Sequence, residues 1–396
     1  MSATMSGRPL EPRVSVSTAP LRITILLGGL GVGGAETQAI ALAAALQEDG
    51  HIVTLAGLAD GPLRAVVESH GLALHVLSRV GGLALSAVPG FARHLVAFKP
   101  HVVYAFLEVQ WVLAIAAASR IPGATRPRVV LGLRTSDYHV RPVQLKARAV
   151  RALARHAARR ADLLIANSRS GLDSYRAFAT ESPAGVVVHN GIDVSRFVPS
   201  PSTREHWRRT WLIPADATVV GHVGRLHPVK DHELLLHAFA RSSTDCRNCH
   251  LVCVGHGDRD RIAVLERLAN ALGIAAHVHF VGALVETHTV FPAFDVLALS
   301  SLREGFPNVV AEAMACGVPA VVTNTGASAD IVHEFGEVAP VGDTDTFSRA
   351  LSQLLTRCSP ELSHDARRHI ASNFSLRSAA SRTAAAMQSL YQVNTT

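Results

Sequence analysis

Short apolar segments alternate with longer segments of mixed character along the first half of the chain. The short segments have the length and the branched apolar composition of buried strands. They fall at residues 23–27, 52–56, 74–76, 102–106, 129–133, 163–166 and 185–188. Between the first three of them the pattern predicts helices at about 36–49 and 63–70. Strands that alternate with helices predict an α/β fold with a doubly wound parallel sheet.

The pattern begins again after a proline- and serine-rich stretch at 197–202, which we interpret as an interdomain linker. Further strands are predicted at 219–223, 250–254, 278–281, 296–299 and 320–323, and helices at 231–240, 258–272, 308–317 and 344–355. An alanine-rich helix is expected from about residue 375. We therefore predict an N-terminal domain at 21–200, a C-terminal domain at 201–375 and a terminal helix at 376–396.

The composition supports two folded domains. Hydrophobic residues make up 48% of the 396 residues and charged residues only 17%, which favours large buried cores over disorder. No apolar stretch approaches the ~20 residues needed to span a bilayer. Residues 1–20 lack an apolar run, so we expect a disordered tail without a secretory signal. These features predict a cytoplasmic protein.

The five cysteines show no repeating pattern, which fits a reducing cytosol. Cys246 and Cys249 form a Cys-x-x-Cys pair with Cys253 nearby, so a zinc or redox site is an alternative. There is no second pair at ligand spacing, and Cys253 lies in an apolar strand. We therefore expect no metal site.

The whole chain has a net charge of +7, and the positive charge is concentrated in its first half. Residues 1–200 hold 21 Lys and Arg against 12 Asp and Glu, whereas the remainder holds 17 against 19. A basic helix is predicted at 144–160, a segment whose basic residues include Lys146, Arg148, Arg151, Arg155, Arg159 and Arg160. Such a helix suits peripheral docking on the anionic inner face of the cytoplasmic membrane. The alternative is an ordinary solvated face, and no nucleic-acid-binding module is visible.

The segment 295–330 carries two glutamates, Glu304 and Glu312, around a Gly-Phe-Pro-Asn turn. A short strand precedes the turn, and Asn308 is predicted to be the N-cap of a helix that ends at Gly317. The helix N-terminus then lies at the carboxyl end of a parallel strand, where backbone N–H groups favour an anion. Carboxylates beside an anion site are suited to accept hydrogen bonds from neutral hydroxyls. The two could also be ordinary glutamates that flank a turn.

This segment resembles the Glu-x7-Glu signature of family 4 of the retaining glycosyltransferases. The resemblance implies the GT-B fold, in which two Rossmann-like domains face a central cleft and the final helix packs back on the N-terminal domain. It covers residues 221–345 strongly and 20–200 more loosely. By this resemblance, Glu304 contacts the donor sugar and Glu312 the ribose, and backbone groups of Gly305, Phe306, Asn308 and Val309 complete the donor pocket.

A second motif, Gly224-Arg225-Leu226-His227-Pro228-Val229-Lys230, follows the first strand of the second domain. Transfer from a nucleotide diphosphate sugar builds negative charge on the departing phosphates, which a metal or fixed cations must neutralise. Arg225 can make a bidentate contact and Lys230 supplies a point charge. The family uses an Arg and a Lys in this role without a divalent metal. The alternative for this pair is a surface salt bridge.

Glycines mark further expected donor contacts. The loop 28–36, Gly-Gly-Leu-Gly-Val-Gly-Gly-Ala-Glu, follows the first strand and opens a helix, so its backbone can approach a phosphate. No acidic residue closes the second strand as a dinucleotide-binding site would require. By resemblance, Gly33 and Gly34 lie at the mouth of the cleft, Gly224 and Gly255 beside the donor, and Leu284 by the nucleobase. The glycines could instead serve packing alone, and residues 189–193 are assigned a structural turn.

One position departs from the family. Many relatives place a histidine after the strand at 129–133, whereas this chain has Arg134, with Asp137 and His139 close behind. Arg134 could hold a phosphate or an acidic sugar. Asp137 and His139 are candidates for acceptor contacts.

These observations predict a retaining, metal-independent glycosyltransferase with Arg225, Lys230 and Glu304 as catalytic residues. It would move a hexosyl or N-acetylhexosaminyl group from a nucleotide diphosphate sugar to a lipid-linked or saccharide acceptor in cell-surface polysaccharide or glycolipid assembly. A nucleotide-sugar epimerase of the same fold and a non-catalytic nucleotide-sugar-binding subunit are alternatives. A NAD-linked dehydrogenase is disfavoured by the missing ribose-binding acid.

Overall fold

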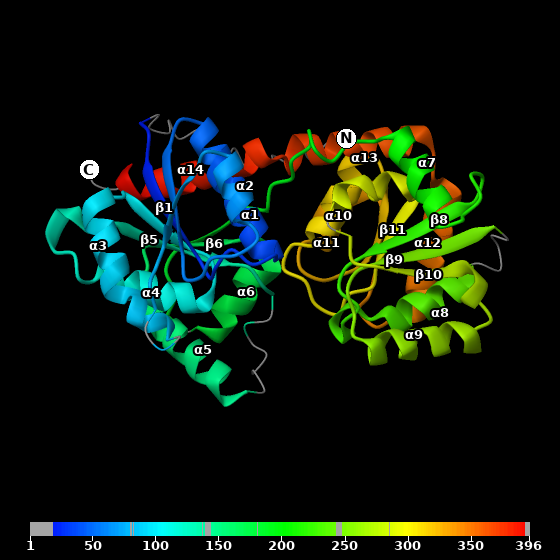
Figure 1. Cartoon of the computed structure of the whole chain (residues 1–396), viewed down its shortest axis with the longest axis horizontal. Helices are drawn as coiled ribbons and strands as arrows, with labels where there is room; N and C mark the ends of the chain where they lie inside the picture. The colour runs from blue at the N-terminus through cyan, green and yellow to red at the C-terminus, as the bar shows by residue number, and fades with distance from the viewer. Residues whose placement is uncertain are drawn as a thin grey trace, which may run out of the picture.

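Two α/β lobes lie side by side in the computed structural model (Figure 1), which describes residues 19–79, 81, 83–136, 138, 144–179, 181–242, 248–284 and 286–392. Most of the predicted N-terminal tail lies outside these residues. The described strands form two separate sheets, and every strand pairing within them is parallel. The prediction of two doubly wound parallel-sheet domains is confirmed.

The sheet of the N-terminal lobe has seven strands among the described residues. From one edge to the other they are β3 (Ala73–Val76), β2 (Ile52–Gly57), β1 (Arg22–Leu27), β4 (Val102–Ala105), β5 (Arg128–Leu133), β6 (Leu163–Ala166) and β7 (Gly185–Val187). The helices around it are α1 (Gly34–Glu48), α2 (Arg64–Ser69), α3 (Val88–Phe98), α4 (Glu108–Ala118), α5 (Leu145–Ala158) and α6 (Arg169–Phe178), with 3₁₀ turns η1 (Ala84–Ala87) and η2 (Gly123–Thr125). The strand order reverses between β1 and β4, so the loops after these strands diverge there.

The sheet of the C-terminal lobe has six strands within the described residues. Their order is β10 (Val278–Gly282), β9 (Cys249–Val254), β8 (Thr218–Val223), β11 (Val296–Leu299), β12 (Ala320–Thr323) and β13 (Glu337–Ala339). The helices are α7 (Pro201–Thr210), α8 (His232–Ser242), α9 (Arg259–Ala271), α10 (Asn308–Ala315), α11 (Ser328–Val332), α12 (Thr344–Arg357) and α13 (Pro360–Asn373). Its 3₁₀ turns are η3 (Pro228–Lys230), η4 (Ala275–His277), η5 (Thr287–Thr289), η6 (Phe291–Ala293) and η7 (His333–Phe335). Here the strand order reverses between β8 and β11.

The predicted linker at 197–202 is partly wrong, because α7 begins inside it. Ser200 is the N-cap, and its hydroxyl accepts a hydrogen bond from the Thr203 amide, while Pro201 occupies the first helical turn. A serine N-cap followed by proline is a strong helix start, which outweighs the reading of proline and serine as flexible linker. Arg204 and Arg208 of α7 then bind Asp295 at 2.6 and 2.7 Å, which fixes the helix to the C-terminal lobe.

The chain crosses between the lobes twice at one place. The Ile192 amide donates to the Phe374 carbonyl at 2.8 Å, and the Leu376 amide donates to the Ile192 carbonyl at 2.9 Å. Helix α14 (Leu376–Gln392) then runs along the top of the molecule to the N-terminal lobe (Figure 1), where Ala380, Ala384 and Met387 join the core beside α1. This double crossing holds the two lobes together at one edge.

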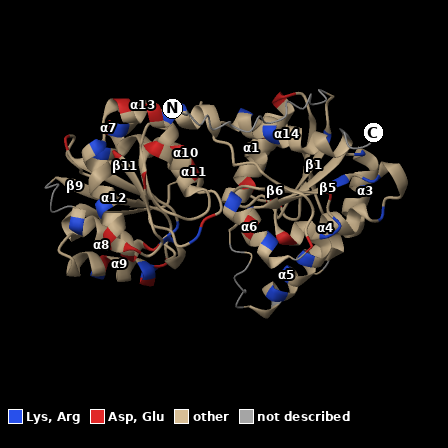
Figure 2. Cartoon of the chain, turned by 180° about the vertical axis from the view of Figure 1, so that it is seen from behind, with Lys and Arg blue, Asp and Glu red and all other residues tan. Residues whose placement is uncertain are grey.

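Of three arginines on α5 and at its C-cap, one is half-buried and two are exposed. Arg151 Nε binds Glu108 at 2.9 Å, whereas the exposed Arg155 guanidinium lies 5.2 Å from the centre of the Phe178 ring and the exposed Arg159 Nε lies 3.4 Å from Glu181. Membrane docking through this helix stays a prediction. Basic residues are still gathered along α5 when the chain is seen from behind (Figure 2). No helix in the described part of the chain is long and apolar enough to cross a membrane.

Candidate functional site

The loops after β8 and β11 meet at the point where the strand order of the C-terminal sheet reverses. Open parallel sheets bind ligands at such a point, outside the carboxyl ends of their strands. Lys230 comes from the first loop and Glu304 from the second. Lys230 Nζ lies 2.6 Å from Glu304 Oε1, and the two side chains are only 18% and 13% exposed. The structure thus brings together two of the residues predicted from sequence to be catalytic.

The position of Lys230 is fixed by its backbone. Lys230 ends the η3 turn, and its amide donates to the His227 carbonyl at 2.8 Å. The hydroxyl of the buried Ser300 donates to the carbonyls of Lys230 and Asp231 at 2.8 and 2.9 Å. Since Ser300 follows β11, the two loops are bonded to each other beneath the ammonium group.

Glu304 is held by equally direct contacts. The Ser301 hydroxyl donates to Glu304 Oε1 at 2.7 Å, and the Glu304 amide donates to Thr325 Oγ1 at 3.0 Å. The next residue, Gly305, lies so close to the Arg134 carbonyl that an added side-chain carbon would be 2.8 Å from that oxygen. A glycine is therefore required where the loop touches the other lobe.

The predicted glycines at 224 and 255 bring two loops into contact. A side-chain carbon on Gly255 would overlap the Gly224 carbonyl, and the Gly255 amide donates to the Gly282 carbonyl at 2.8 Å. The space above Gly224 is bordered by the Lys230 stem, whose Cε would lie 3.5 Å from an added carbon. Arg225 follows with an exposed side chain, for which no ion pair is found among the described residues. Leu284 is half-buried and packs on the core of the lobe.

Asn308 does not cap α10 as predicted. The N-cap is Pro307, and Asn308 is the first helical residue. Its side-chain Oδ1 instead accepts a hydrogen bond from Asn190 Nδ2 at 2.8 Å. An asparagine before an apolar run favours the cap position, but here a partner in the other lobe takes the side chain. Phe306 is buried against His189 and Phe374, so its side chain belongs to the core, and Val309 is half-buried.

Glu312 lies on the second turn of α10. Burial raises the pKa of its carboxyl group to about 7, and the nearby positive charge of Arg196 opposes this increase. The two glutamates therefore have different cations nearby: Glu304 pairs with Lys230, whereas Glu312 lies near Arg196. The half-buried carboxyl group of Glu312 can accept a hydrogen bond from a hydroxyl or donate one to it.

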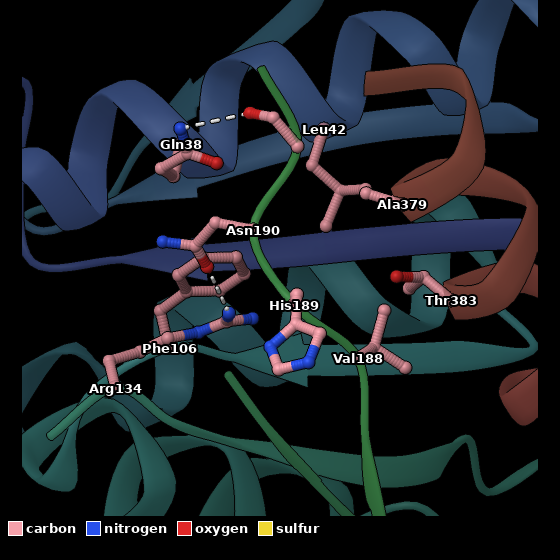
Figure 3. A pocket seen from close by; sticks show the side chains of 10 residues that line it. Gln38, Leu42, Phe106, Arg134, Val188, His189, Asn190, Ala379 and Thr383 are labelled. Atoms are coloured by element: carbon pink, nitrogen blue, oxygen red, sulfur yellow. Dashed lines mark hydrogen bonds between the residues drawn. The ribbon is translucent and has the colours of Figure 1, made fainter. Parts of the chain in front are cut away.

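Arg134 lies at the carboxyl end of β5 in the N-terminal lobe. Its Nη1 donates to Asn190 Oδ1 at 3.0 Å, its Nη2 donates to the Tyr104 hydroxyl, and its guanidinium lies 4.3 Å from the centre of the Phe106 ring. Figure 3 shows Arg134, Asn190 and Phe106 beside a small cavity that Gln38 and His189 also line. Asp137 and His139, the other acceptor-side candidates, lie outside the described residues.

Asn190 connects Arg134 to Asn308 and so links the lobes by side chains. Two further contacts join the facing loops: the Ser136 hydroxyl donates to the Glu304 carbonyl, and the Ser170 hydroxyl donates to the Gly326 carbonyl at 3.2 Å. The glycine loop takes part as well, because a side-chain carbon on Gly34 would lie 3.8 Å from Asn308 Nδ2. Gly33 is the N-cap of α1, so the starts of α1 and α10 lie next to each other.

The amino-acid sequence of each lobe matches the model of a known protein family. The model for "Glycosyltransferase Family 4" matches residues 32–196, and the model for "Glycosyl transferases group 1" matches residues 217–357. The chain belongs to glycosyltransferase family 4. The predicted family and the GT-B fold are thereby confirmed.

Sequence relatives of this family 4 member include two D-inositol 3-phosphate glycosyltransferases. That of Corynebacterium urealyticum is 34% identical over 205 residues, which is 49% of this chain and 47% of the relative. That of Mycobacteroides abscessus is 32% identical over 219 residues, 53% of this chain and 48% of the relative. The chain thus spans about half the length of these curated relatives.

Solved structures show the same fold over nearly the whole family 4 chain. HepE of Anabaena in complex with UDP has a TM-score of 0.77 at 23% identity, covering 92% of this chain and 98% of HepE. WaaG, a glycosyltransferase involved in lipopolysaccharide biosynthesis, has a TM-score of 0.68 at 18% identity, covering 91% and 98%.

Sequence reasoning overlooked several residues that build this family 4 site. Asn190 was assigned to a structural turn, since an Asn-Gly step is first of all a turn signal. Tyr104 carried no motif of its own, and only the packing of the carboxyl ends of β4 and β5 reveals its contact with Arg134. Within the described residues, no group of three or more His, Cys, Asp or Glu could hold a metal ion; Cys246 lies outside them.

Proposed function

We propose that this chain transfers a sugar from a nucleotide diphosphate sugar to an acceptor hydroxyl, with retention of configuration and without a divalent metal. The observation that carries the proposal is the Lys230–Glu304 pair at the switch point of the C-terminal sheet. Asn308, on the helix that follows the Glu304 loop, lies against Gly34 of the glycine loop in the other lobe. A cation and a carboxylate at 2.6 Å can serve a diphosphate and a sugar that lie side by side.

The diphosphate is placed against the loop after β8. Lys230 and the exposed guanidinium of Arg225 neutralise the charge that develops on the leaving phosphate oxygen. The backbone amides at the start of α10 add to this positive field. Because the cations are part of the chain, charge neutralisation needs no bound metal.

The two glutamates bind the sugar and the ribose of the donor. Glu304 accepts hydrogen bonds from sugar hydroxyls once the diphosphate has drawn Lys230 away. Glu312 contacts the ribose, where its half-buried carboxyl group can both accept and donate. The backbone of Gly305, Asn308 and Val309 closes the pocket.

Retention follows from front-face attack. The bond between the anomeric carbon and the diphosphate oxygen breaks with both electrons going to phosphate. The acceptor oxygen then forms a new bond on the same face, and its proton passes to the departing phosphate oxygen. Closure of the two lobes, through contacts such as Asn190 to Asn308, excludes water from this step.

The proposed acceptor is a lipid-linked or growing saccharide in the assembly of a cell-surface polysaccharide or glycolipid. The positive charge of residues 1–200 supports an anionic or membrane-bound carrier. The role of the structural relative WaaG in lipopolysaccharide biosynthesis points the same way. The protein would act from the cytoplasm at the inner face of the membrane.

The test is incubation of the purified protein with UDP-, GDP- and ADP-sugars and lipid-linked saccharide acceptors, with and without EDTA. We expect one donor to be consumed equally in both conditions, and NMR of the product to show the anomeric configuration of the donor. Loss of turnover with EDTA would overturn metal independence, and an inverted product would overturn front-face attack. Sugar interconversion without an acceptor would identify an epimerase, and nucleotide binding without turnover a non-catalytic subunit.

A further inference from the structure

Two histidines lie buried beneath the loop that carries Gly224 and Lys230. His222 belongs to β8, two residues before Gly224, and His232 is the first residue of α8. They are 0% and 1% exposed, and their ring centres lie 4.5 Å apart. Buried polar groups are as a rule hydrogen-bonded. Among the described residues, however, one ring nitrogen of His222 and both of His232 have no hydrogen-bond partner.

The contacts of His222 define its tautomer. Its Nδ1 lies 3.0 Å from the carbonyl oxygen of Ala298, which can only accept, so Nδ1 carries the proton of this bond. Burial lowers the pKa of the ring to about 4, so the imidazole is neutral at pH 7. A neutral imidazole with its proton on Nδ1 has an unprotonated Nε2, which is a hydrogen-bond acceptor. His222 therefore offers a buried acceptor that no described residue uses.

This acceptor lies next to Gly224 and the Lys230 side chain. A carbon added to Gly224 would lie 3.4 Å from His222 Nε2 and 3.5 Å from Lys230 Cε, which are ordinary contact distances, so there is room for one more atom. The Lys230 ammonium group is one bond beyond Cε. Rotation of the last side-chain torsions therefore carries it from Glu304 towards the point above Gly224, within reach of His222 Nε2.

Lys230 also has donors to spare. Two backbone amides of the same loop are already used, since Gly224 donates to the Val254 carbonyl at 2.9 Å and Leu226 to the His256 carbonyl at 2.8 Å. The ammonium group of Lys230 has three N–H donors, and Glu304 Oε1 is the acceptor found for them within the described part of the chain. Lys230 can therefore supply the hydrogen bond that His222 lacks.

We propose that His222 is a positioning residue for the donor: its Nε2 accepts a hydrogen bond from the Lys230 ammonium group when that group has left Glu304 and binds the diphosphate. This inference rests on the proposed function and deepens it. In the ion pair with Glu304, a carboxylate offsets the positive charge of Lys230. A neutral imidazole orients the ammonium group without offsetting its charge, so the full charge is available to the leaving phosphate.

The exchange of partners favours the donor-bound position of Lys230. While Lys230 is paired with Glu304, the buried Nε2 of His222 has no partner, which is unfavourable. When the diphosphate is bound, the ammonium group serves both the phosphate and Nε2, and Glu304 is released to the sugar hydroxyls. Loss of the acceptor on His222 should therefore weaken the binding of a diphosphate in particular.

The test compares nucleoside diphosphates with nucleoside monophosphates, which lack the leaving phosphate that Lys230 binds. Calorimetric titration with UDP, GDP and ADP first identifies the base that binds the wild-type protein most tightly. The diphosphate and the monophosphate of that base are then titrated into every variant. The ratio of their two Kd values reports the contact of Lys230, and it does not depend on the fraction of the protein that is folded.

Two substitutions of His222 separate its two nitrogens. His222→Asn keeps a donor for the Ala298 carbonyl but removes the acceptor at the position of Nε2. We expect it to raise the Kd of the diphosphate at least about tenfold and to leave that of the monophosphate unchanged. His222→Gln places an amide oxygen near the position of Nε2 and should restore most of the diphosphate affinity. His250→Asn is the matched control, because His250 is a buried histidine of the adjacent strand β9 that bonds His279; its ratio should equal that of wild type.

Two further measurements distinguish a contact with Lys230 from a general structural role. On the background of Lys230→Met, His222→Asn should cause no further loss of diphosphate affinity, because its effect passes through the ammonium group. In the wild-type protein, NMR of the imidazole nitrogens should show the His222 Nε2 signal, identified by its absence in His222→Gln, shifting on addition of the diphosphate. The monophosphate should leave this signal in place.

The outcomes separate the two proposals. If no nucleotide binds, the proposed function fails, and the role of His222 fails with it. If Lys230→Met weakens diphosphate binding but His222→Asn leaves the ratio unchanged, or the Nε2 signal does not move, the role of His222 is wrong while the proposed function stands. If His222→Asn weakens both nucleotides alike, or adds its full effect to that of Lys230→Met, His222 supports only the fold of the lobe and its assignment is equally wrong.

Discussion

Lys230 and Glu304 form an ion pair of 2.6 Å between two loops of the C-terminal lobe. Each group is the other's counter-ion in the structure. Under the proposed function, a diphosphate that binds Lys230 competes with Glu304 for the ammonium group, and in doing so it frees the carboxylate for the hydroxyls of the sugar. The proposal therefore links donor binding and site assembly through a single contact.

Replacing Lys230 by methionine should reduce turnover by about 10²–10³-fold, because it removes a fixed positive charge from the leaving group. The Kd for the nucleotide diphosphate should rise as well. The measurements are steady-state kinetics with the identified donor and calorimetric titration with the nucleotide. Arg267→Met, an exposed cation on α9, is the matched control. Full turnover by Lys230→Met would contradict the assignment.

Asn190 is the second group for which the structure makes a sharp prediction. Asn190→Ala removes the hydrogen bond that Asn308 Oδ1 accepts across the lobes, and it also removes the acceptor of Arg134 Nη1 within the N-terminal lobe. We expect the lobes to open, so that the radius of gyration from X-ray scattering increases and the KM for the donor rises more than kcat falls. Asn270→Ala on the exposed face of α9 should change neither quantity. An unchanged radius and KM would show that the Asn190–Asn308 contact does not hold the lobes closed.

The raised pKa of Glu312 predicts how the stability of the fold depends on pH. Its pKa is raised from 4.5 to about 7, so the folded chain holds this proton more tightly than the unfolded chain does. The contribution of Glu312 to stability is therefore greatest below pH 4.5, falls as the pH rises to about 7, and is constant above. Glu312→Gln should flatten this part of the profile of Tm against pH and raise Tm at pH 8. Glu266→Gln, an exposed residue on α9, should leave the profile as it is.

Replacing Asp295 is expected to lower the free energy of unfolding strongly, although its side chain is partly exposed. It binds Arg204 and the nearly inaccessible Arg208, and it accepts from the Val219 amide at 2.7 Å. Asp295→Ala leaves a buried guanidinium without a counter-ion, which should cost about 3–5 kcal/mol. Asp345→Ala breaks an exposed pair with Arg241 and should change the free energy of unfolding by less than about 1 kcal/mol. Urea unfolding of the two variants makes the comparison; equal effects would contradict it.

The fold was readily predicted because most strands are short, mainly apolar runs. β4, β6 and β11 are buried along their whole length, and such runs stand out from their polar flanks. Strand β13 was missed because its three residues, Glu337–Ala339, include a glutamate and an exposed valine. The start of α7 was missed because Ser200 and Pro201 are typical of both linkers and helix starts.

The candidate site was predictable only where it follows a local motif. Lys230 and Glu304 could be named because each follows a strand within a recognisable loop. Their direct contact could not, since it depends on which strands are neighbours at the switch point. The role of Arg134 illustrates the same limit: its sequence position suggested a free cation, whereas Tyr104, Phe106 and Asn190, distant in sequence, engage it.

Helix α5 presents exposed leucines in addition to the basic residues on which the predicted membrane contact rests. Arg155 and Arg159 are exposed, and Leu145 and Leu153 are 79% and 44% exposed. Exposed leucines flanked by basic residues suit insertion among anionic head groups. We expect the protein to co-sediment with vesicles containing phosphatidylglycerol and to dissociate as salt is added.

Replacing Leu145 and Leu153 together by aspartate should weaken vesicle binding by at least about tenfold, because burying each leucine is worth about 1.5–3 kcal/mol. The control is Leu212→Asp, which alters an even more exposed leucine, 88% accessible, on the C-terminal lobe. Nucleotide affinity should be unchanged in both variants, since α5 and Leu212 lie apart from the Lys230–Glu304 pair. If the leucine variants bind vesicles as wild type does, the basic charge of the first half of the chain serves another partner, and α5 is an ordinary surface helix.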